Sequence, residues 1–158
     1  MKGLKMVTIF ADTSSSIPVN KAKELGIEYF PQIIIFGDQS FRDDNEINTK
    51  TFLEKLSKSS ALPKTAAPPP ALYHPLFEKH LKNKNSIIVL TPSTKVSGTF
   101  RSVEVAAQDF PNADIQILDT MSIGASFASI VLSAVQWAKN GKSSAEILEK
   151  AKDLINCE

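Results

Sequence analysis

Three short stretches of this chain carry hydroxyl side chains, which can donate hydrogen bonds to an anion. The first contains Asp12 and Ser14, the second runs from Ser93 to Thr99, and the third runs from Asp119 to Ser122. Each stretch follows a short run of apolar residues. Neutral donors of this kind suit a carboxylate or a phosphate group. The pattern therefore predicts an anion site if the fold brings the three stretches together.

The second stretch is the strongest candidate. Its residues that offer a hydroxyl group or an approachable backbone are Ser93, Thr94, Ser97, Gly98 and Thr99. A helix-compatible segment follows at 102–108, and the free N–H groups of a helix start add further donors. The same spacing also fits a serine that merely caps the helix, and the stretch alone leaves both interpretations open.

Strands and helices are expected to alternate, which predicts an α/β fold with a mainly parallel sheet flanked by helices. Apolar runs predict strands at 5–11, 27–36, 87–90 and 114–118. Periodicity and capping signals predict helices at 17–25, 49–58, 71–81, 102–108, from about 123 to Gly141, and from Ser143 to Ile155. The carboxyl ends of parallel strands share one edge of a sheet, so the three hydroxyl-rich turns are expected to converge there.

The run at 27–36 and its surroundings carry finer expectations. Its near-continuous apolar character favours a strand buried on both faces, interrupted at Pro31. The turn 37–40 predicts a hairpin whose return strand follows. The proline-rich segment 61–70 predicts an ordered loop or a polyproline II segment.

Composition bounds the class of protein. The chain has 158 residues, a formal net charge of +1 and 42% hydrophobic residues, which predicts a single domain with a real core and no nucleic-acid partner. Its one cysteine, Cys157, cannot form an internal disulfide and fits a reducing compartment. The uncharged segment 122–138 is short and rich in serine, which favours a buried helix over a membrane span. We therefore expect a cytoplasmic protein.

Five motifs in order resemble the DegV family of bacterial lipid-binding proteins, which includes the fatty-acid-binding subunit of fatty acid kinase. The motifs are Asp12-Thr13-Ser14, Phe36-Gly37-Asp38 with Phe41-Arg42-Asp43, Leu62-Pro63-Lys64-Thr65 with Pro68, Ser93 with Ser97-Gly98-Thr99, and Asp119-Thr120. The resemblance extends from about Met6 to Ile155. It implies a long-chain fatty acid as the ligand, no further cofactor, and a kinase as the partner that receives the bound lipid.

The resemblance also implies which residues hold the carboxylate. By match of motif they are Thr65, in the proline-flanked loop, and Ser97, with Ser93, Thr94, Gly98 and Thr99 lining the turn and Asp12 and Ser14 nearby. Two neutral hydroxyl donors and a helix start can hold a carboxylate without a salt bridge. The family usually has a second hydroxyl after the threonine, whereas this chain has Ala66.

Length is the other departure from the family. Family members look like two-domain proteins of nearly twice this size, so residues 1–158 resemble the first domain alone, with the second domain absent. This predicts a truncated product, an expressed fragment or a stand-alone domain whose acyl groove is open or is closed by a partner. An open groove exposes an apolar patch, which favours a homodimer.

An enzyme and a pure interaction domain are the alternatives to a binding protein. Asp12 occupies the place of a phosphotransferase nucleophile, but the second aspartate of that motif is replaced by Ser14. Ser97 as a hydrolase nucleophile lacks the glycine two positions before it, where Lys95 stands. His74 and His80 lie six residues apart and are expected on different, solvated faces of a helix, which predicts no metal site and no catalytic histidine. The third alternative is a truncated interaction domain that binds no lipid.

Overall fold

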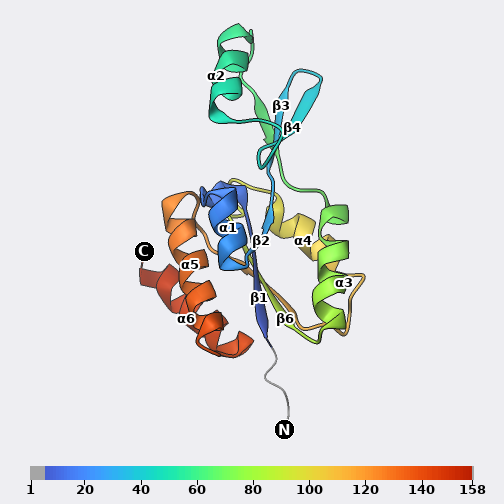
Figure 1. The fold of residues 1–158 in the computed structure, drawn as a ribbon, viewed down its shortest axis with the longest axis vertical. Helices are drawn as coiled ribbons and strands as arrows, with labels where there is room; N and C mark the ends of the chain where they lie inside the picture. The colour runs from blue at the N-terminus through green and yellow to red at the C-terminus, as the bar shows by residue number, and fades with distance from the viewer. Residues whose placement is uncertain (1–5, 158) are drawn as a thin grey trace.

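The structure, a computed structural model, describes residues 6–157. It consists of a sheet covered by helices on both faces and a smaller arm that projects beyond one end of that sheet (Figure 1). The first strand begins at Val7, and Lys5, where the sequence predicts its start, lies outside the described residues. The predicted α/β class with a mainly parallel sheet is confirmed.

The main sheet has four parallel strands in the order β2-β1-β6-β7. The strands are β1 (Val7–Asp12), β2 (Glu28–Phe30), β6 (Ser86–Thr91) and β7 (Ile115–Asp119). β1 and β6 are central and almost wholly buried, which explains why their sequences are nearly continuous apolar runs. Their carboxyl ends all lie at the same edge of the sheet, beneath the arm (Figure 1).

Alternating side chains of the central strands build two cores, because successive residues of a strand point to opposite faces. Ile9 and Ala11 pack against one helical layer, and Phe10 packs against the other. The first layer is α1 (Val19–Leu25), α5 (Ala125–Lys139) and α6 (Ser144–Cys157), and the second is α3 (His74–Lys82) and α4 (Thr99–Ala107) (Figure 1). The second core is aromatic, with Phe10 lying 5.5 Å from Phe77 between ring centroids.

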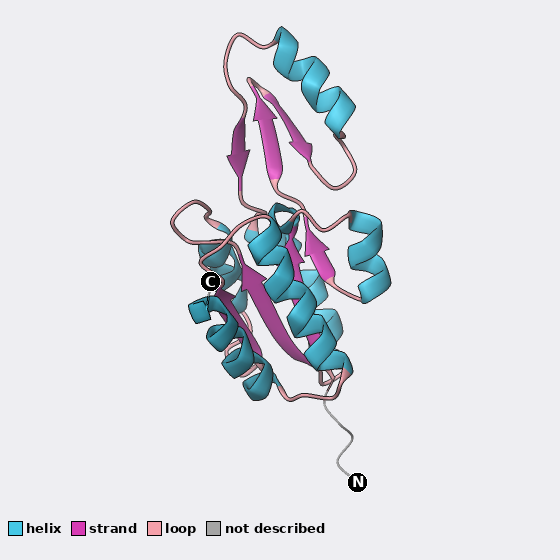
Figure 2. Ribbon diagram, turned by 90° about the vertical axis from the view of Figure 1, so that its left-hand side faces the viewer, coloured by secondary structure: helices cyan, strands magenta, loops and turns pink. Residues whose placement is uncertain are grey.

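The arm contains an antiparallel sheet of order β4-β3-β5 and one helix (Figure 2). Its elements are β3 (Ile33–Phe36), β4 (Gln39–Arg42), α2 (Thr49–Lys58) and β5 (Lys64–Ala66). The hairpin turns at Gly37, whose φ of 57° lies in the left-handed region that suits glycine. The Asn48 side chain accepts from the Thr51 backbone N–H at 3.0 Å and fixes the start of α2 where the sequence predicts it.

Three finer expectations for this region are wrong. The run 27–36 is not one strand, because β2 belongs to the parallel sheet and β3 to the antiparallel one. Pro31 stands between them, and a residue without an N–H group ends strand pairing. β3 is half-buried rather than enclosed on both faces. The proline-rich segment also contains a strand, β5, because its backbone pairs with β3.

A capping box begins α6. The Glu146 carboxylate accepts from the Ser143 backbone N–H and hydroxyl, each at 2.9 Å, and from Lys142 Nζ at 2.8 Å. These bonds, led by that of Lys142, lower the pKa of Glu146 from 4.5 to about 2. The cap is therefore fully present above the ordinary glutamate pKa and is lost as the pH falls toward 2.

We expect the Glu146 carboxyl carbon to titrate at about 2 when it is followed by nuclear magnetic resonance. Lys142→Ala should move that midpoint upward, because the hydrogen bond that lowers the pKa of Glu146 most is lost. A midpoint at the ordinary glutamate value in the unchanged protein would show that the capping box does not form in solution.

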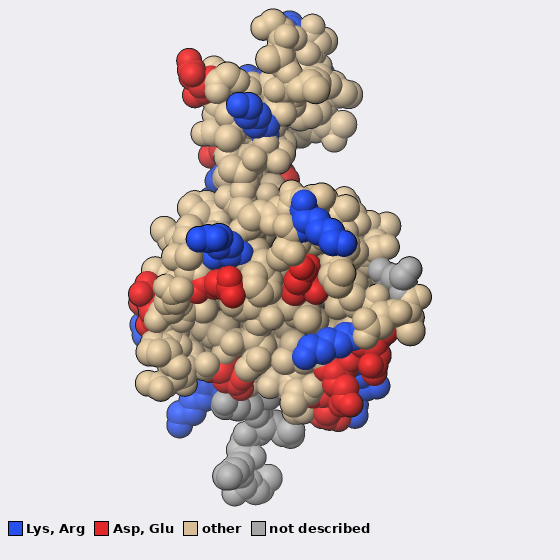
Figure 3. Space-filling model, turned by 180° about the vertical axis from the view of Figure 1, so that it is seen from behind, with Lys and Arg blue, Asp and Glu red and all other residues tan. Residues whose placement is uncertain are grey.

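The surface shows no large area of one charge on the face opposite to that of Figure 1. Lysine and arginine side chains there lie beside aspartate and glutamate (Figure 3). Within residues 6–157, no helix combines the length and the apolar character needed to cross a membrane.

Candidate functional site at the carboxyl edge of the sheet

The three hydroxyl-rich turns meet at the carboxyl edge of the parallel sheet. The Ser93 backbone N–H donates to the Ser122 carbonyl at 2.9 Å, and the Thr94 hydroxyl donates to Asp119 Oδ2 at 2.7 Å. The Gly124 backbone N–H donates to the Ser14 carbonyl at 2.9 Å. The convergence that the sequence predicts is confirmed, and it is held by hydrogen bonds between turns.

Asp12 lies at the centre of this edge and is 1% exposed. Its Oδ1 accepts from the Ser14 backbone N–H at 2.9 Å and from the Ser14 hydroxyl. Its Oδ2 accepts from Gln32 Nε2 at 2.7 Å and from the Thr99 hydroxyl at 3.0 Å. Four donors fill the acceptor positions of one carboxylate. Asp12 therefore holds three separate segments of the chain together.

Burial raises the pKa of Asp12 above its ordinary value of 3.8, and the four hydrogen bonds oppose that rise. A carboxylate that acts as a nucleophile must present a free lone pair to its substrate. Both Asp12 oxygens are already occupied by donors of the protein. The geometry thus favours a structural role for Asp12 over the phosphotransferase alternative.

Ser97 is the half-buried hydroxyl beside this centre. Its Oγ lies 3.0 Å from Thr99 Oγ1 and accepts from the Thr99 backbone N–H at 3.2 Å. The N-cap residue of α4 is Gly98, so Ser97 is not the N-cap itself, although its hydroxyl accepts from the first N–H group of the helix. The Ser97 hydroxyl proton stays available to a neighbour, so this hydrogen bond and ligand binding are compatible.

The start of α4 is open to approach. Its N-cap residue is Gly98, and no side chain of Gly98 blocks or caps the first turn. A methyl group built on Gly98 would meet the Ala67 methyl group at 3.8 Å, and the Ser102 hydroxyl donates to the Pro68 carbonyl at 2.5 Å. The proline-rich segment therefore rests against the first turn of α4.

Thr65 lies on the arm rather than at the edge of the main sheet. It is exposed on β5, where it pairs with Ile34 across the arm sheet. Across residues 6–157, no hydrogen bond to the Thr65 hydroxyl is formed, so that donor is free for solvent or a ligand. Thr65 and Ser97 thus belong to two units, the arm and the main sheet. The segment that follows β5 is joined to α4 by the hydrogen bond from the Ser102 hydroxyl to the Pro68 carbonyl.

Gln32 is the residue that sequence reasoning missed. Its side chain donates to Asp12 and also to Thr99 Oγ1 at 3.0 Å, while its backbone N–H donates to the Thr13 hydroxyl at 2.9 Å. Thr13 in turn donates to Asp43 Oδ1 at 2.6 Å, so the base of the arm is fixed to the end of β1. Gln32 is a polar residue after Pro31 inside an otherwise apolar run, and this position is the feature of the sequence that indicates a special role.

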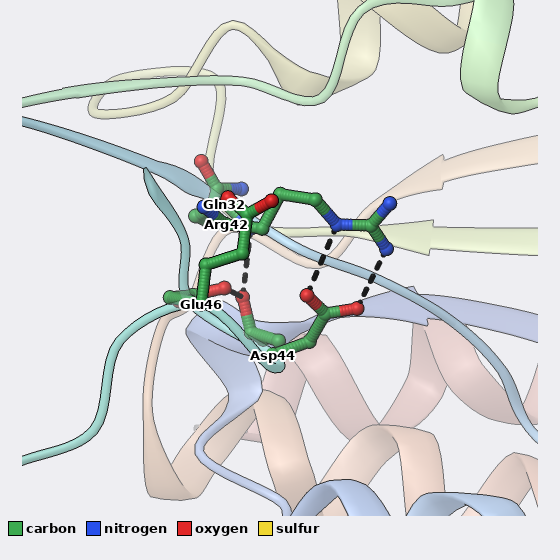
Figure 4. Close-up of polar contacts among 6 residues, drawn as sticks. Gln32, Arg42, Asp44 and Glu46 are labelled. Carbon is green, nitrogen blue, oxygen red and sulfur yellow. Dashed lines mark hydrogen bonds and ion pairs between the residues drawn. The ribbon is translucent and has the colours of Figure 1, made fainter. Parts of the chain in front are cut away.

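Arg42, at the end of β4, does not offer a free charge to an anion. Its guanidinium contacts the Asp44 carboxylate through Nε at 3.1 Å and Nη2 at 2.7 Å, and its backbone N–H donates to Glu46 at 2.7 Å (Figure 4). Its positive charge is thus matched by carboxylates at the base of the hairpin.

The two histidines lie away from this edge. His80 was expected in solvent, but its side chain is only 12% exposed, with Nε2 2.6 Å from Glu28 and Nδ1 3.2 Å from the Thr8 hydroxyl. His74 pairs with Asp109 at 3.1 Å. Among the described residues, no three histidine, cysteine, aspartate or glutamate side chains gather as metal ligands. The group beside the Ser97 hydroxyl is the hydroxyl of Thr99 and not a histidine imidazole.

A family model matches residues 6–157, almost the whole chain, and it is described as an uncharacterised protein of the DegV family. The chain belongs to the DegV family. A DegV domain-containing protein of Clostridium perfringens is 31% identical over 150 residues, which cover 91% of this chain and 51% of that protein. The chain spans about half the length of the curated DegV relatives it matches.

Solved DegV structures share the fold. A structure described as fatty acid binding of a DegV family protein from Thermus thermophilus is 26% identical and superposes with a TM-score of 0.87, over 96% of this chain and 54% of that one. DegV of Bacillus subtilis, described as a fatty acid binding protein, is 24% identical with a TM-score of 0.86 over the same shares. The second likeness shows the fold alone.

The predicted DegV site residues therefore fall into three groups. Asp12, Ser14, Ser97 and Thr99 form one hydrogen-bonded network. Ser93 and Thr94 organise the adjoining turns, and Gly98 leaves the start of α4 open. Thr65 stands on the arm with a free hydroxyl.

Proposed function

We propose that this DegV chain binds a long-chain fatty acid by its carboxylate, with Ser97 and Thr65 as neutral donors. The observation that carries the proposal is the half-buried Ser97 hydroxyl at the start of α4, whose N-cap residue is a glycine, on the edge where three turns converge. Hydrogen bonds to a charged acceptor contribute roughly 1.5–3 kcal/mol each. The fatty acid binding of the Thermus thermophilus relative supports the choice of ligand.

Exposed apolar side chains on the turns of this edge supply a surface for the acyl chain. Val96, Met121 and Ile123 lie on the same turns and are 69%, 60% and 56% exposed. Each CH₂ group that such a surface removes from water contributes about 0.8 kcal/mol. The tail thus provides most of the affinity, and the carboxylate fixes the orientation.

The remaining parts of the proposal follow from this placement. A carboxylate at Ser97 faces the outside of the sheet edge, where a kinase partner can reach it, so the chain acts as a binding protein rather than an enzyme. The exposed apolar side chains of Val96, Met121 and Ile123 favour burial of this surface against a second copy of residues 1–158 or against another partner. The single exposed cysteine, Cys157, is consistent with a cytoplasmic location.

Ser97→Ala is expected to weaken decanoate binding about ten-fold, because one hydrogen bond to a charged acceptor is lost. Isothermal titration calorimetry measures the affinity, and thermal unfolding shows whether the variant stays folded. Ser60→Ala is the matched control, since Ser60 is exposed and lies in the loop after α2. Equal affinity of the Ser97→Ala variant and the unchanged protein would remove Ser97 from the site.

A further inference from the structure

The order of protons in the Asp12 network can be read from its donors and acceptors. An ionised carboxylate only accepts, so the Thr99 hydroxyl must donate to Asp12 Oδ2, and the Gln32 amide must turn its nitrogen toward the same oxygen. Gln32 Nε2 also donates to Thr99 Oγ1. Thr99 donates its only hydroxyl proton to Asp12. In the 3.0 Å contact between the Ser97 and Thr99 hydroxyl groups, Ser97 is therefore the donor.

This order directs both hydroxyl protons inward. The chain runs from the Ser97 hydroxyl to the Thr99 hydroxyl and on to Asp12, with both oxygen–oxygen steps at 3.0 Å. Ser97 therefore presents a lone pair rather than a proton to the outside while Asp12 is ionised. A ligand carboxylate at Ser97 would then face an acceptor lone pair instead of a hydroxyl proton.

The charge of Asp12 also opposes the binding of a ligand carboxylate at Ser97. The described residues that lower the pKa of Asp12 through hydrogen bonds are Ser14, Thr99 and Gln32. All three side chains are neutral. The titratable neighbours are Asp43, Tyr29 and Tyr73, which are acids, and the negative charge of Asp12 contributes to raising the pKa of each. A second anion two hydroxyl groups away is therefore repelled unless Asp12 is neutralised.

We infer that Ser97, Thr99 and Asp12 form a proton relay, and that the binding of an ionised fatty acid is coupled to the uptake of one proton by Asp12. The proton comes from solvent and forms an O–H bond at Asp12 Oδ2. Asp12 then donates to Thr99, Thr99 donates to Ser97, and Ser97 donates to the ligand carboxylate. Two hydroxyl groups rotate, no other covalent bond changes, and the net charge of the site stays at −1.

The relay fits the structure in both orders. Gln32 Nε2 and the two Ser14 donors keep their bonds to Asp12 whether it is ionised or protonated, because each Asp12 oxygen retains an acceptor position. Burial of Asp12 favours the protonated form and lowers the free energy needed to take up the proton. Thr99, which is 2% exposed, is a positioning residue that acts on the ligand only through Ser97.

Calorimetry in several buffers tests this inference, which rests on the proposed function. Sodium decanoate is titrated into the full chain near neutral pH in buffers of different ionisation enthalpy, and the dependence of the heat on the buffer gives the number of protons taken up. We expect an uptake of up to one proton near neutral pH. The uptake should become smaller as the pH is lowered, because a protein in which Asp12 is already protonated takes up no further proton. Thr99→Val, which has the shape of threonine but no hydroxyl, should bind decanoate several-fold more weakly and without proton uptake. Thr99→Ser should restore the uptake.

The outcomes separate the inference from the proposed function. Decanoate binding by the unchanged protein without proton uptake overturns the relay and leaves lipid binding intact. Equal uptake by the Thr99→Val variant also overturns the relay, because that variant has no hydroxyl between Ser97 and Asp12. An unchanged protein that gives no binding heat with decanoate, and shows no thermal stabilisation by a long-chain fatty acid such as oleate, refutes lipid binding and the relay together.

Discussion

Phe77→Ala is expected to lower the free energy of unfolding by roughly 3–5 kcal/mol, the range for aromatic residues removed from a core. Phe77 is 0% exposed and lies on α3 against the parallel sheet. Its ring is 5.5 Å from Phe10, 5.9 Å from Tyr73 and 5.8 Å from Phe110 between centroids. Alanine leaves a cavity that these rings, which come from separate elements, cannot close together. Denaturation by urea, followed by circular dichroism, measures the loss.

Phe52→Ala is the matched control for Phe77→Ala. Phe52 is half-buried on α2 and contacts Phe36 within the arm. Its removal should cost less and should leave the parallel sheet intact. Equal losses for the two variants would contradict the description of the aromatic core as the main support of the α3 and α4 layer.

Asp12→Ala is the second large effect, with an expected loss of roughly 3 kcal/mol at neutral pH. Removing the carboxylate leaves Gln32 Nε2 and the Thr99 hydroxyl without their acceptor, at about 1–3 kcal/mol for each buried group. Burial of the charge works in the other direction, because burial raises the pKa of Asp12 and so makes the ionised form unfavourable. The unpaired donors outweigh that gain, since alanine cannot accept from them. Chemical denaturation of both proteins at one pH measures the difference.

Asp12→Asn separates the charge from the shape. The folded-state pKa of Asp12 is raised, so its contribution to stability is largest below the ordinary value of 3.8 and is lost as the pH rises through the folded-state pKa. The wild-type protein should therefore gain stability relative to Asp12→Asn as the pH is lowered through that window. An Asp12→Ala protein as stable as the wild type at neutral pH would contradict the role of Asp12 as the centre of the edge.

Local signals predicted much of the fold. The Asn48 cap and the period of apolar residues placed α2 at 49–58, where the structure has it. Gly26 ends α1 with a φ of 77°, as its position in the sequence predicts. The shared edge of parallel strands was enough to predict that the turns near Asp12, Ser97 and Asp119 meet. These features depend on neighbouring residues or on a general rule of sheet geometry.

Features that depend on distant pairing were not predictable from the sequence. β5 is a strand only because Thr65 pairs with Ile34, and nothing within the proline-rich segment itself indicates that partner. The run 27–36 predicts one strand, because apolar character does not show which sheet a residue joins. Gln32 reaches Thr99, 67 residues away in sequence, and only the folded chain shows that contact. The hydrogen bonds from Gln32 and Thr99 to Asp12 also join distant residues, so the sequence does not show them.

Native mass spectrometry of the purified chain shows whether the protein carries a fatty acid. We predict a bound mass that organic extraction identifies as a long-chain fatty acid, with one lipid for each site. The occupied fraction should be lower in the Ser97→Ala protein and unchanged in the Ser60→Ala protein. A chain that is empty when purified and also rejects added fatty acid would contradict lipid binding by these residues.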